Sequence, residues 1–254
     1  MRAHELLSVA SAAARTADHS SPPTAVRTSG TLPTAGETVS PSPSQFEEAF
    51  RSLRSNLLLL TPANVRSILV ASAIPGEGKS TVAANLACSL TAVGKRVLLI
   101  DADLRRPSMH RLFQTSSAPG LVDVLRGTHA AESIWHQTMA GPVVLPSGRP
   151  PDDPQAFFES GELDTLLRAA RDQFDFVLID SAPLLSVADT TLIAPRVDGV
   201  IVVMKYAAVS EAEAGVAFGR LRSARGKVLG CILSQVTETA GSFYAYDREY
   251  LEKR

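Results

Sequence analysis

The sequence predicts an α/β fold, in which a mostly parallel β-sheet carries helices on both of its faces. Three observations support this. Short β-rich runs alternate with longer segments of helical periodicity, hydrophobic residues make up 45% of the 254 residues, and no internal repeat interrupts the alternation. Such βα alternation favours parallel strands that are buried on both faces.

Composition divides the chain into three parts. Residues 1–45 include 27 Ser, Thr, Pro or Ala and no aromatic residue, so 1–44 are predicted to form a disordered tail. A capping box formed by Ser44 and Glu47 predicts the start of a helix that ends before Pro62. We therefore place the folded domain at 45–236. The polar segment 237–254 is predicted to be a flexible C-terminal tail.

Six β-rich runs and five further helical segments follow this first helix. The strands are predicted at 67–71, 96–100, 143–145, 174–179, 199–205 and 228–233, and the helices are predicted to begin near Lys79, Ser108, Gln155, Asp189 and Ser210. Because parallel strands end at the same edge of a sheet, the residues that follow these strands are expected to share one binding edge.

The overall charge excludes some functions. The chain has 25 Lys and Arg against 26 Asp and Glu, so it lacks the basic field of a nucleic-acid-binding protein and no nucleic-acid partner is expected. Cys88 and Cys231 lie in apolar runs and are predicted to be core thiols in a reducing compartment. No apolar stretch approaches the ~18 residues of a membrane span, so we expect a cytoplasmic protein.

A glycine-rich loop joins the first predicted strand of the sheet to the helix that follows it. The loop reads Pro75-Gly76-Glu77-Gly78-Lys79-Ser80-Thr81. Its glycines allow backbone amides to face phosphate oxygens, and the N-terminus of the helix favours negative charge. In such a P-loop, Lys79 contacts the β and γ phosphates of a nucleotide and Ser80 ligates Mg²⁺. The alternative is an ordinary turn with a solvated lysine.

Three aspartates follow predicted strands. Asp101 and Asp103 come after 96–100, and Asp180 comes after 174–179. Because these strands end at one edge of the sheet, we expect all three carboxylates to surround one Mg-nucleotide. Acidic residues are also common where loops begin, so solvated strand ends are the alternative.

Together these motifs resemble those of the bacterial tyrosine autokinases of capsule and exopolysaccharide export, which are P-loop NTPases. The glycine-rich loop is similar to their Walker A motif, residues 99–107 (Leu-Ile-Asp-Ala-Asp-Leu-Arg-Arg-Pro) to Walker A′, and residues 176–180 (Phe-Val-Leu-Ile-Asp) to Walker B. The resemblance covers residues 45–254, and the Walker A′ string beside Walker A is its most specific element.

The resemblance implies a protein-tyrosine kinase that uses ATP and Mg²⁺. Lys79 and Ser80 would hold the nucleotide and the metal, Asp103 and Asp180 would position Mg²⁺, and Asp101 would accept the proton of the tyrosine hydroxyl. A phenol has an ordinary pKa of ~10 and is a poor nucleophile at neutral pH, so a nearby carboxylate supplies what the reaction lacks.

The C-terminal tail holds three of the four tyrosines, Tyr244, Tyr246 and Tyr250. The resemblance implies that neighbouring subunits phosphorylate them and thereby regulate polysaccharide polymerisation and export. Phosphorylation is expected to dissociate the oligomer, because each phosphotyrosine adds about −1.5 to −2 charges. Docking of the tail on its own domain as a helix is the alternative.

The first helix carries Glu48, Arg51 and Arg54 on adjoining turns. In the family that the sequence resembles, this motif builds a ring of subunits, whereas a solvated face with pairs inside one helix is the alternative. The resemblance also implies a separate transmembrane chain-length regulator, which activates the kinase and recruits it to the inner face of the plasma membrane. A protein-tyrosine phosphatase is a further expected partner.

Two other functions fit the same motifs. Partition and septum-positioning ATPases share the fold, but they carry a signature lysine where Ile74 stands and a glycine where Pro75 stands. A nucleotide-binding assembly module of the export machine that transfers little phosphate is the second. The sequence departs from the kinase family at one position on the side where the adenine base is expected. Ser234 stands where the family commonly has Asn, and one hydroxyl replaces the paired donor and acceptor of an amide, so the selectivity for adenine is expected to be less secure than phosphate binding.

Overall fold

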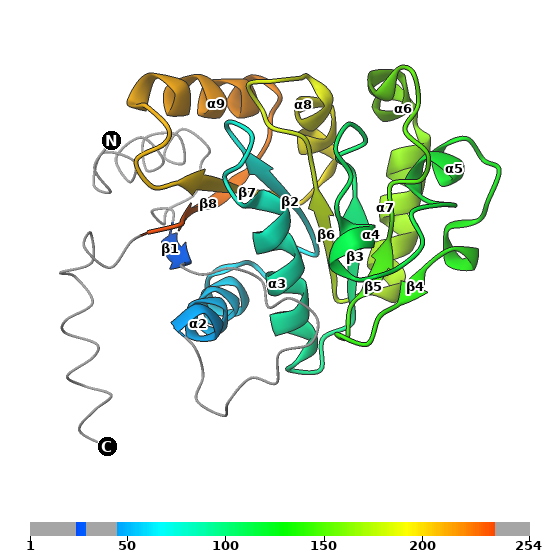
Figure 1. Cartoon of the computed structure of the whole chain (residues 1–254), viewed down its shortest axis with the longest axis horizontal. Coiled ribbons are helices and arrows are strands. Elements are labelled where there is room, and N and C mark those ends of the chain that lie inside the picture. The colour runs from blue at the N-terminus through cyan, green and yellow to red at the C-terminus, as the bar shows by residue number, and fades with distance from the viewer. Residues whose placement is uncertain (1–23, 29–44, 237–254) are drawn as a thin grey trace.

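The computed structural model describes residues 24–28 and 45–236, which form an eight-stranded sheet covered by helices on both faces (Figure 1). The strand order is β1-β8-β7-β2-β6-β3-β5-β4, and every neighbouring pair is parallel except β4 and β5. The predicted α/β fold with a mostly parallel sheet is therefore confirmed.

The elements have the following bounds. The strands are β1 Thr24–Thr28, β2 Ser67–Ser72, β3 Val97–Asp101, β4 His136–Gln137, β5 Val143–Leu145, β6 Phe176–Asp180, β7 Gly199–Lys205 and β8 Val228–Ser234. The α-helices are α2 Gln45–Leu60, α3 Lys79–Thr91, α4 Met109–Leu112, α5 Leu121–Leu125, α6 Pro154–Glu159, α7 Glu162–Gln173, α8 Asp189–Ile193 and α9 Glu211–Ser223. Two short 3₁₀ helices, η1 Ala131–Ser133 and η2 Ala194–Arg196, complete the set.

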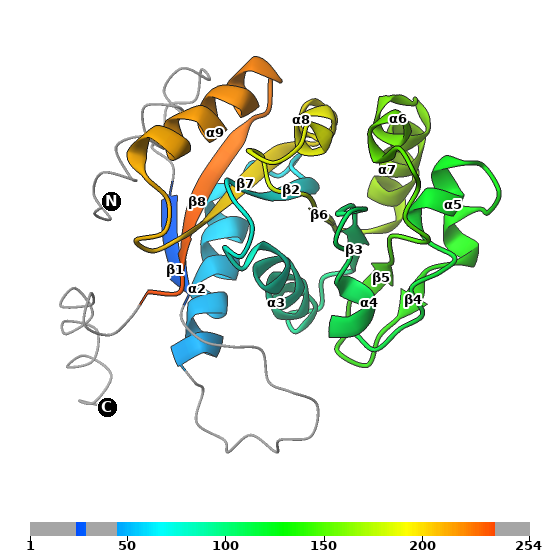
Figure 2. The ribbon, with the colours of Figure 1, turned by 45° about the horizontal axis from the view of Figure 1, so that its top comes forward.

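Each strand of the sheet centre contributes side chains to two separate cores. In β2, Leu69 packs among residues from α7, α8 and α9, whereas its neighbours Ile68 and Val70 pack among residues from α2 and α3. Figure 2 shows α2 and α3 on one side of the sheet and α7, α8 and α9 on the other. Because successive side chains of a strand point to opposite faces, both faces require apolar residues. This explains the continuous apolar runs in the sequence.

Within residues 45–236, the α-helices and strands differ from the sequence prediction at three places. The helix predicted to begin near Gln155 is two helices, α6 and α7, and the short elements β4 and α5 were not predicted. In α6, the Asp153 side chain accepts a hydrogen bond from the Gln155 amide and Pro154 occupies the first turn. Ser160 at its C-terminus has extended backbone angles, so one helix cannot continue into the next.

Strand β1 lies within the segment that was predicted to be a disordered tail. It pairs with β8 in parallel, from Thr24 opposite Gly230 to Thr28 opposite Ser234. The run is only five residues long and lies in a Ser- and Pro-rich segment, and its partners lie about 200 residues away in the sequence, so the composition of the segment did not indicate a strand. The other residues of 1–44 and residues 237–254 lie outside the described residues. The two flexible tails expected there therefore stay predictions.

Two further expectations concern cysteines and membranes. Both thiols are unpaired, and burial raises the pKa of Cys88 to about 11 and that of Cys231 to about 12, which suits packing rather than nucleophilic chemistry. Across 24–28 and 45–236, none of the helices combines the length and the apolar character that crossing a bilayer requires.

Candidate active site

The glycine-rich loop leaves β2 and forms an open turn before α3. Gly76 and Gly78 both have φ of +83°, in the left-handed region that favours glycine, and nothing lies within 4 Å of a Cβ added at Gly76. Gly78 is the N-cap of α3, so no side chain caps the first amides of this helix. The loop therefore offers uncapped backbone N–H groups to an anion, as a phosphate cradle does.

Lys79 lies at the start of α3 and points at two of the predicted aspartates. Its Nζ is 2.5 Å from Asp180 Oδ1 and 3.8 Å from Asp103 Oδ2. The Ser80 hydroxyl donates to Asp180 Oδ2 at 2.6 Å. These four side chains thus come together, although they originate from the loop and from the ends of β3 and β6.

Asp101 completes the group from the end of β3, where it is paired in register with Asp180 of β6. Its Oδ2 accepts the N–H groups of Ser108 and Met109 at 2.8 and 2.9 Å, whereas its Oδ1 is buried and has no hydrogen-bond partner. Burial, followed by the negative charge of Asp180, raises the pKa of Asp101 to about 7.

Asp103 is the more accessible carboxylate of the Walker A′ string. Its side chain is 10% exposed, and its Oδ1 accepts the Arg106 N–H at 3.0 Å. Burial raises its pKa above the ordinary value although Lys79 acts in the opposite direction. Lys79 pairs with Asp103 and Asp180, and the third carboxylate, Asp101, lies close enough to be influenced by its charge. The site therefore holds more carboxylates than basic groups.

This surplus of negative charge fits a divalent cation. Hydroxyl and carboxylate oxygens such as those of Ser80 and Asp180 are the ligands that Mg²⁺ prefers, and Asp101 Oδ1 is a buried acceptor that lacks a donor. No group of three or more His, Cys, Asp or Glu within 24–28 and 45–236 is arranged to hold a metal ion. The site therefore suits a cation that brings further ligands from nucleotide phosphates and water.

The other loop residues divide between solvent and interior. Pro75 and Gly76 are exposed, Thr81 is half-buried, and Glu77 is 1% exposed. Glu77 Oε2 accepts the Ile74 N–H at 2.8 Å and its Oε1 accepts the Lys205 N–H at 3.0 Å. The Glu77 side chain is thus used inside the protein, and only its main chain belongs to the cradle.

Sequence reasoning did not identify an ion pair beside the site. Arg105 of the Walker A′ string binds Asp189 in a bidentate manner, at 2.9 Å from Nε to Oδ2 and 3.2 Å from Nη2 to Oδ1. The pair connects the loop after β3 to the start of α8, and the hydrogen bond to Asp189 raises the pKa of Arg105 further above its ordinary value. Asp189 is fully buried, although in the sequence it looks like an ordinary first residue of a helix.

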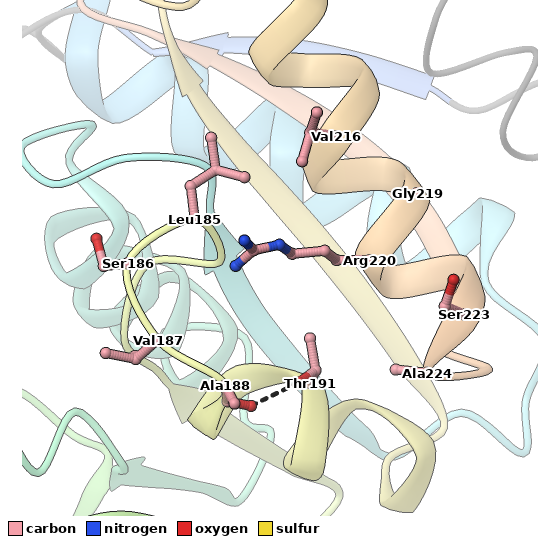
Figure 3. A pocket seen from close by; sticks show the side chains of 10 residues that line it. All are labelled: Leu185, Ser186, Val187, Ala188, Thr191, Val216, Gly219, Arg220, Ser223 and Ala224. Atoms are coloured by element: carbon pink, nitrogen blue, oxygen red, sulfur yellow. Dashed lines mark hydrogen bonds between the residues drawn. The ribbon is translucent and has the colours of Figure 1, made fainter.

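A hollow of about 890 Å³ lies between α8 and α9 (Figure 3). Arg220 reaches from α9 toward the loop that contains Leu185, and its Nη1 donates to the carbonyl of Leu184 at 2.6 Å. None of the predicted site residues lines this hollow. It is therefore separate from the phosphate cradle.

The proposed oligomerisation residues lie on α2. Arg51 Nη1 contacts Glu48 Oε2 at 2.9 Å, and both side chains are exposed. Arg54 instead donates to the carbonyl and hydroxyl oxygens of Ser89 in α3, at 3.1 and 3.3 Å. Glu48 and Arg51 are therefore presented on the surface, whereas Arg54 also holds α2 against α3. The three tyrosines of the tail lie outside the described residues.

The protein family follows from comparison with known proteins. Residues 65–217 match the model of a family described as an AAA domain. The chain is 34% identical to the tyrosine-protein kinase YwqD of Bacillus subtilis over 201 residues, which cover 78% of this chain and 85% of that protein. This chain belongs to the bacterial tyrosine-protein kinases. It is also 34% identical to the tyrosine-protein kinase ptk of Acinetobacter johnsonii over 198 residues, 77% of this chain but only 27% of that longer protein.

The chain resembles a solved kinase domain more closely than it resembles a solved ATPase of the rival class. The kinase domain of the Escherichia coli tyrosine kinase ETK matches with a TM-score of 0.73 and 28% identity, over 75% of this kinase and 76% of that chain. The chimeric protein CapA2B2 matches with a TM-score of 0.72 and 29% identity, over 76% and 86%. The cell division ATPase MinD of Pyrococcus furiosus reaches only 0.58 with 26% identity, over 66% and 71%. The kinase interpretation is thus supported over the partition and septum-positioning class.

Proposed function

We propose that this kinase transfers the γ-phosphoryl group of ATP to tyrosines of the C-terminal segment of a neighbouring subunit, and that this transfer regulates capsule or exopolysaccharide polymerisation and export. The observation that carries the proposal is Lys79, which pairs with Asp103 and Asp180 beside the buried Asp101 and an uncapped helix N-terminus. Such a site suits a metal-bound triphosphate.

Each residue has a part in this reaction. Main-chain amides of the loop and Lys79 would hold the phosphates, and Ser80, Asp103 and Asp180 would hold Mg²⁺. When bound, Mg²⁺ would supply positive charge that offsets the negative charge of the phosphates. Asp101 takes the proton from the tyrosine hydroxyl. The tyrosine oxygen forms a bond to the γ phosphorus of ATP, and the bond between this phosphorus and the oxygen that links it to the β-phosphate breaks, so ADP leaves. Without Mg²⁺, burial and the negative charge of Asp180 raise the pKa of this carboxyl to about 7, so Asp101 is a stronger base than an ordinary aspartate.

Phosphotyrosine detection and ATP hydrolysis on the same samples test this proposal. We expect a tyrosine signal from the wild type and none from Lys79→Met or from a triple Phe variant of Tyr244, Tyr246 and Tyr250. The triple variant should still bind ATP, because it keeps every residue assigned to the nucleotide and the metal. ATP hydrolysis without any phosphotyrosine would support a switch ATPase, and binding without either activity would support an assembly module.

We propose that the kinase works as a ring and with a membrane-bound activator. The exposed Glu48 and Arg51 support a contact between subunits, and the similarity to the chimeric CapA2B2, which joins parts of two proteins, supports a separate activating chain. A phosphatase that reverses the tail modification completes this scheme. Light scattering should give a smaller mass for Arg51→Ala than for the wild type, and a smaller mass after ATP treatment; unchanged masses would contradict the ring.

A further inference from the structure

The outer side of the P-loop is bound by the end of β8. The Ser234 hydroxyl donates to the main-chain carbonyl of Glu77 at 2.6 Å, and Gln235 Nε2 donates to the carbonyl of Gly76 at 3.3 Å. Ser234 is only 3% exposed. A Cβ added at Gly78 would lie 3.8 Å from both of these donor atoms, so the loop packs directly against the strand end.

Holding these carbonyls also fixes the direction of the amides. In a planar trans peptide the C=O and the following N–H point in opposite directions. A Glu77 carbonyl that faces β8 therefore directs the Gly78 N–H away from β8, and a Gly76 carbonyl that faces Gln235 does the same for the Glu77 N–H. Two glycines in the left-handed region give the loop little rigidity of its own, so an external support matters here.

The Glu77 side chain supports the loop from a second strand. Its two carboxylate oxygens accept one N–H each, from Ile74 at the loop's start and from Lys205 at the end of β7. The ionised Glu side chain accepts hydrogen bonds at both of its oxygens. A Gln of the same length would replace one of these oxygens with an NH₂ group, which would then face a backbone N–H. The loop is thereby tied to both β7 and β8.

We propose that Ser234 and Glu77 are positioning residues, which aim the P-loop amides at the triphosphate by fixing the loop to the ends of β8 and β7. Ser234 then acts on the phosphate site through the main chain of Glu77. Its place in the sequence suggested contact with the adenine base, and this proposal replaces that role. This inference rests on the proposed function only in taking a triphosphate as the ligand.

Competition binding with Mg²⁺ present tests the proposal on the full chain, with inorganic triphosphate and adenosine each displacing a fluorescent ATP analogue. For Ser234→Ala we expect triphosphate to bind about two- to tenfold more weakly, the usual effect of one lost hydrogen bond, while adenosine binding stays unchanged. Ser234→Thr keeps the hydroxyl and should restore the affinity for triphosphate. Glu77→Gln should weaken triphosphate binding at least as much.

Thr138→Val is the matched control. Thr138 is a buried residue whose hydroxyl donates to the carbonyl of Pro142 at 2.7 Å, in the connection between β4 and β5 and not at the loop. It should leave both affinities at the wild-type value. An equal loss of adenosine affinity in Ser234→Ala would show that Ser234 reads the base, and unchanged triphosphate affinity would show that it does not position the loop; either result overturns the proposal.

The same data keep this inference separate from the kinase proposal. Binding of triphosphate requires no transfer of phosphate, so a wild type that binds Mg·ATP but never modifies tyrosine would overturn the proposed function alone. Where the kinase is active, Ser234→Ala should raise the KM for ATP more than it lowers kcat. A merely structural role would instead reduce the amount of active enzyme and leave KM unchanged.

Discussion

A charged cluster lies at each end of the parallel strands: one at their carboxyl ends, which we call the P-loop edge, and one at their amino ends, the opposite edge. Only the cluster at the amino ends is neutralised by partners within the protein. At the edge opposite the P-loop, Asp198 Oδ2 accepts the N–H groups of Arg66 and Ser67 and the Ser67 hydroxyl, at 2.8 to 3.0 Å, and it lies 3.5 Å from Arg171 Nε. At the P-loop edge, Asp101 leaves one buried oxygen unpaired and lies next to a second carboxylate.

The pKa shifts of the two aspartates reflect this difference. Burial raises the pKa of Asp101 and the charge of Asp180 adds to the effect. Burial would also raise the pKa of Asp198, but hydrogen bonds from Ser67 and Arg66 and the charge of Arg171 outweigh it, so the pKa is lowered. Charge that is neutralised within the protein closes and stabilises the fold, whereas surplus charge of one sign marks the edge where a ligand of opposite sign binds.

The largest effect is expected when the basic side chain of each edge, Lys79 or Arg171, is replaced by Met. Lys79→Met should reduce tyrosine phosphorylation at least ~100-fold, because a preorganised positive charge at the phosphates is removed. Arg171→Met should keep nucleotide affinity and kinase activity but lower the free energy of unfolding by about 1–2 kcal/mol, because its hydrogen bonds to Ser67 and to the Arg196 carbonyl are lost. Denaturation curves and activity assays on both variants check this, and an inactive Arg171→Met of normal stability would abolish the contrast.

Removing one negative charge from each edge should change stability in opposite directions. At pH 8 and without Mg²⁺, Asp101→Asn is expected to raise the free energy of unfolding by about 2 kcal/mol, because a buried carboxylate no longer has to ionise. Asp198→Asn should lower it by about 1–2 kcal/mol, because charge-assisted hydrogen bonds weaken. Urea denaturation of the two variants beside the wild type measures both changes. Destabilisation of similar size in both would mean that the edges do not differ.

The difference between the two aspartates should also appear in the pH dependence of the wild type's stability. Without Mg²⁺, folded Asp101 keeps its proton up to a pH of about 7, whereas in the unfolded chain it loses the proton near 3.8. The folded state therefore binds more protons between these values, and the contribution of Asp101 to stability falls as pH rises, by at most about 1.4 kcal/mol per pH unit.

The pH dependence of Asp198 has the opposite sign. Its pKa is lowered on folding, so its contribution is present above the ordinary value and is lost as the pH falls below it. Unfolding of the wild type, Asp101→Asn and Asp198→Asn measured from pH 4 to 8 separates the two. Asp101→Asn should remove the decline in stability toward pH 7. If the decline persists in this variant, a group other than Asp101 causes it.

Much of the P-loop edge could be predicted from the sequence, because its residues directly follow strands or form a contiguous loop. Asp101 and Asp180 end adjacent parallel strands, so their proximity follows from topology alone. Glu77 and Ser234 could not be assigned in this way. Their side-chain partners are decided by which way each peptide and carboxylate faces, and this depends on loop angles that the residue types do not specify.

By itself the sequence determined the α/β class, the phosphate loop and the set of three aspartates, because strand periodicity and loop composition are local properties of the chain. Only the tertiary structure decided that Arg105 pairs with Asp189, that Arg54 binds α3, and that β1 joins the sheet beside β8. These pairings connect residues 35 to about 200 positions apart, and the physical reason is that many partners of equal chemistry exist along the chain while packing brings only one of them within hydrogen-bonding distance.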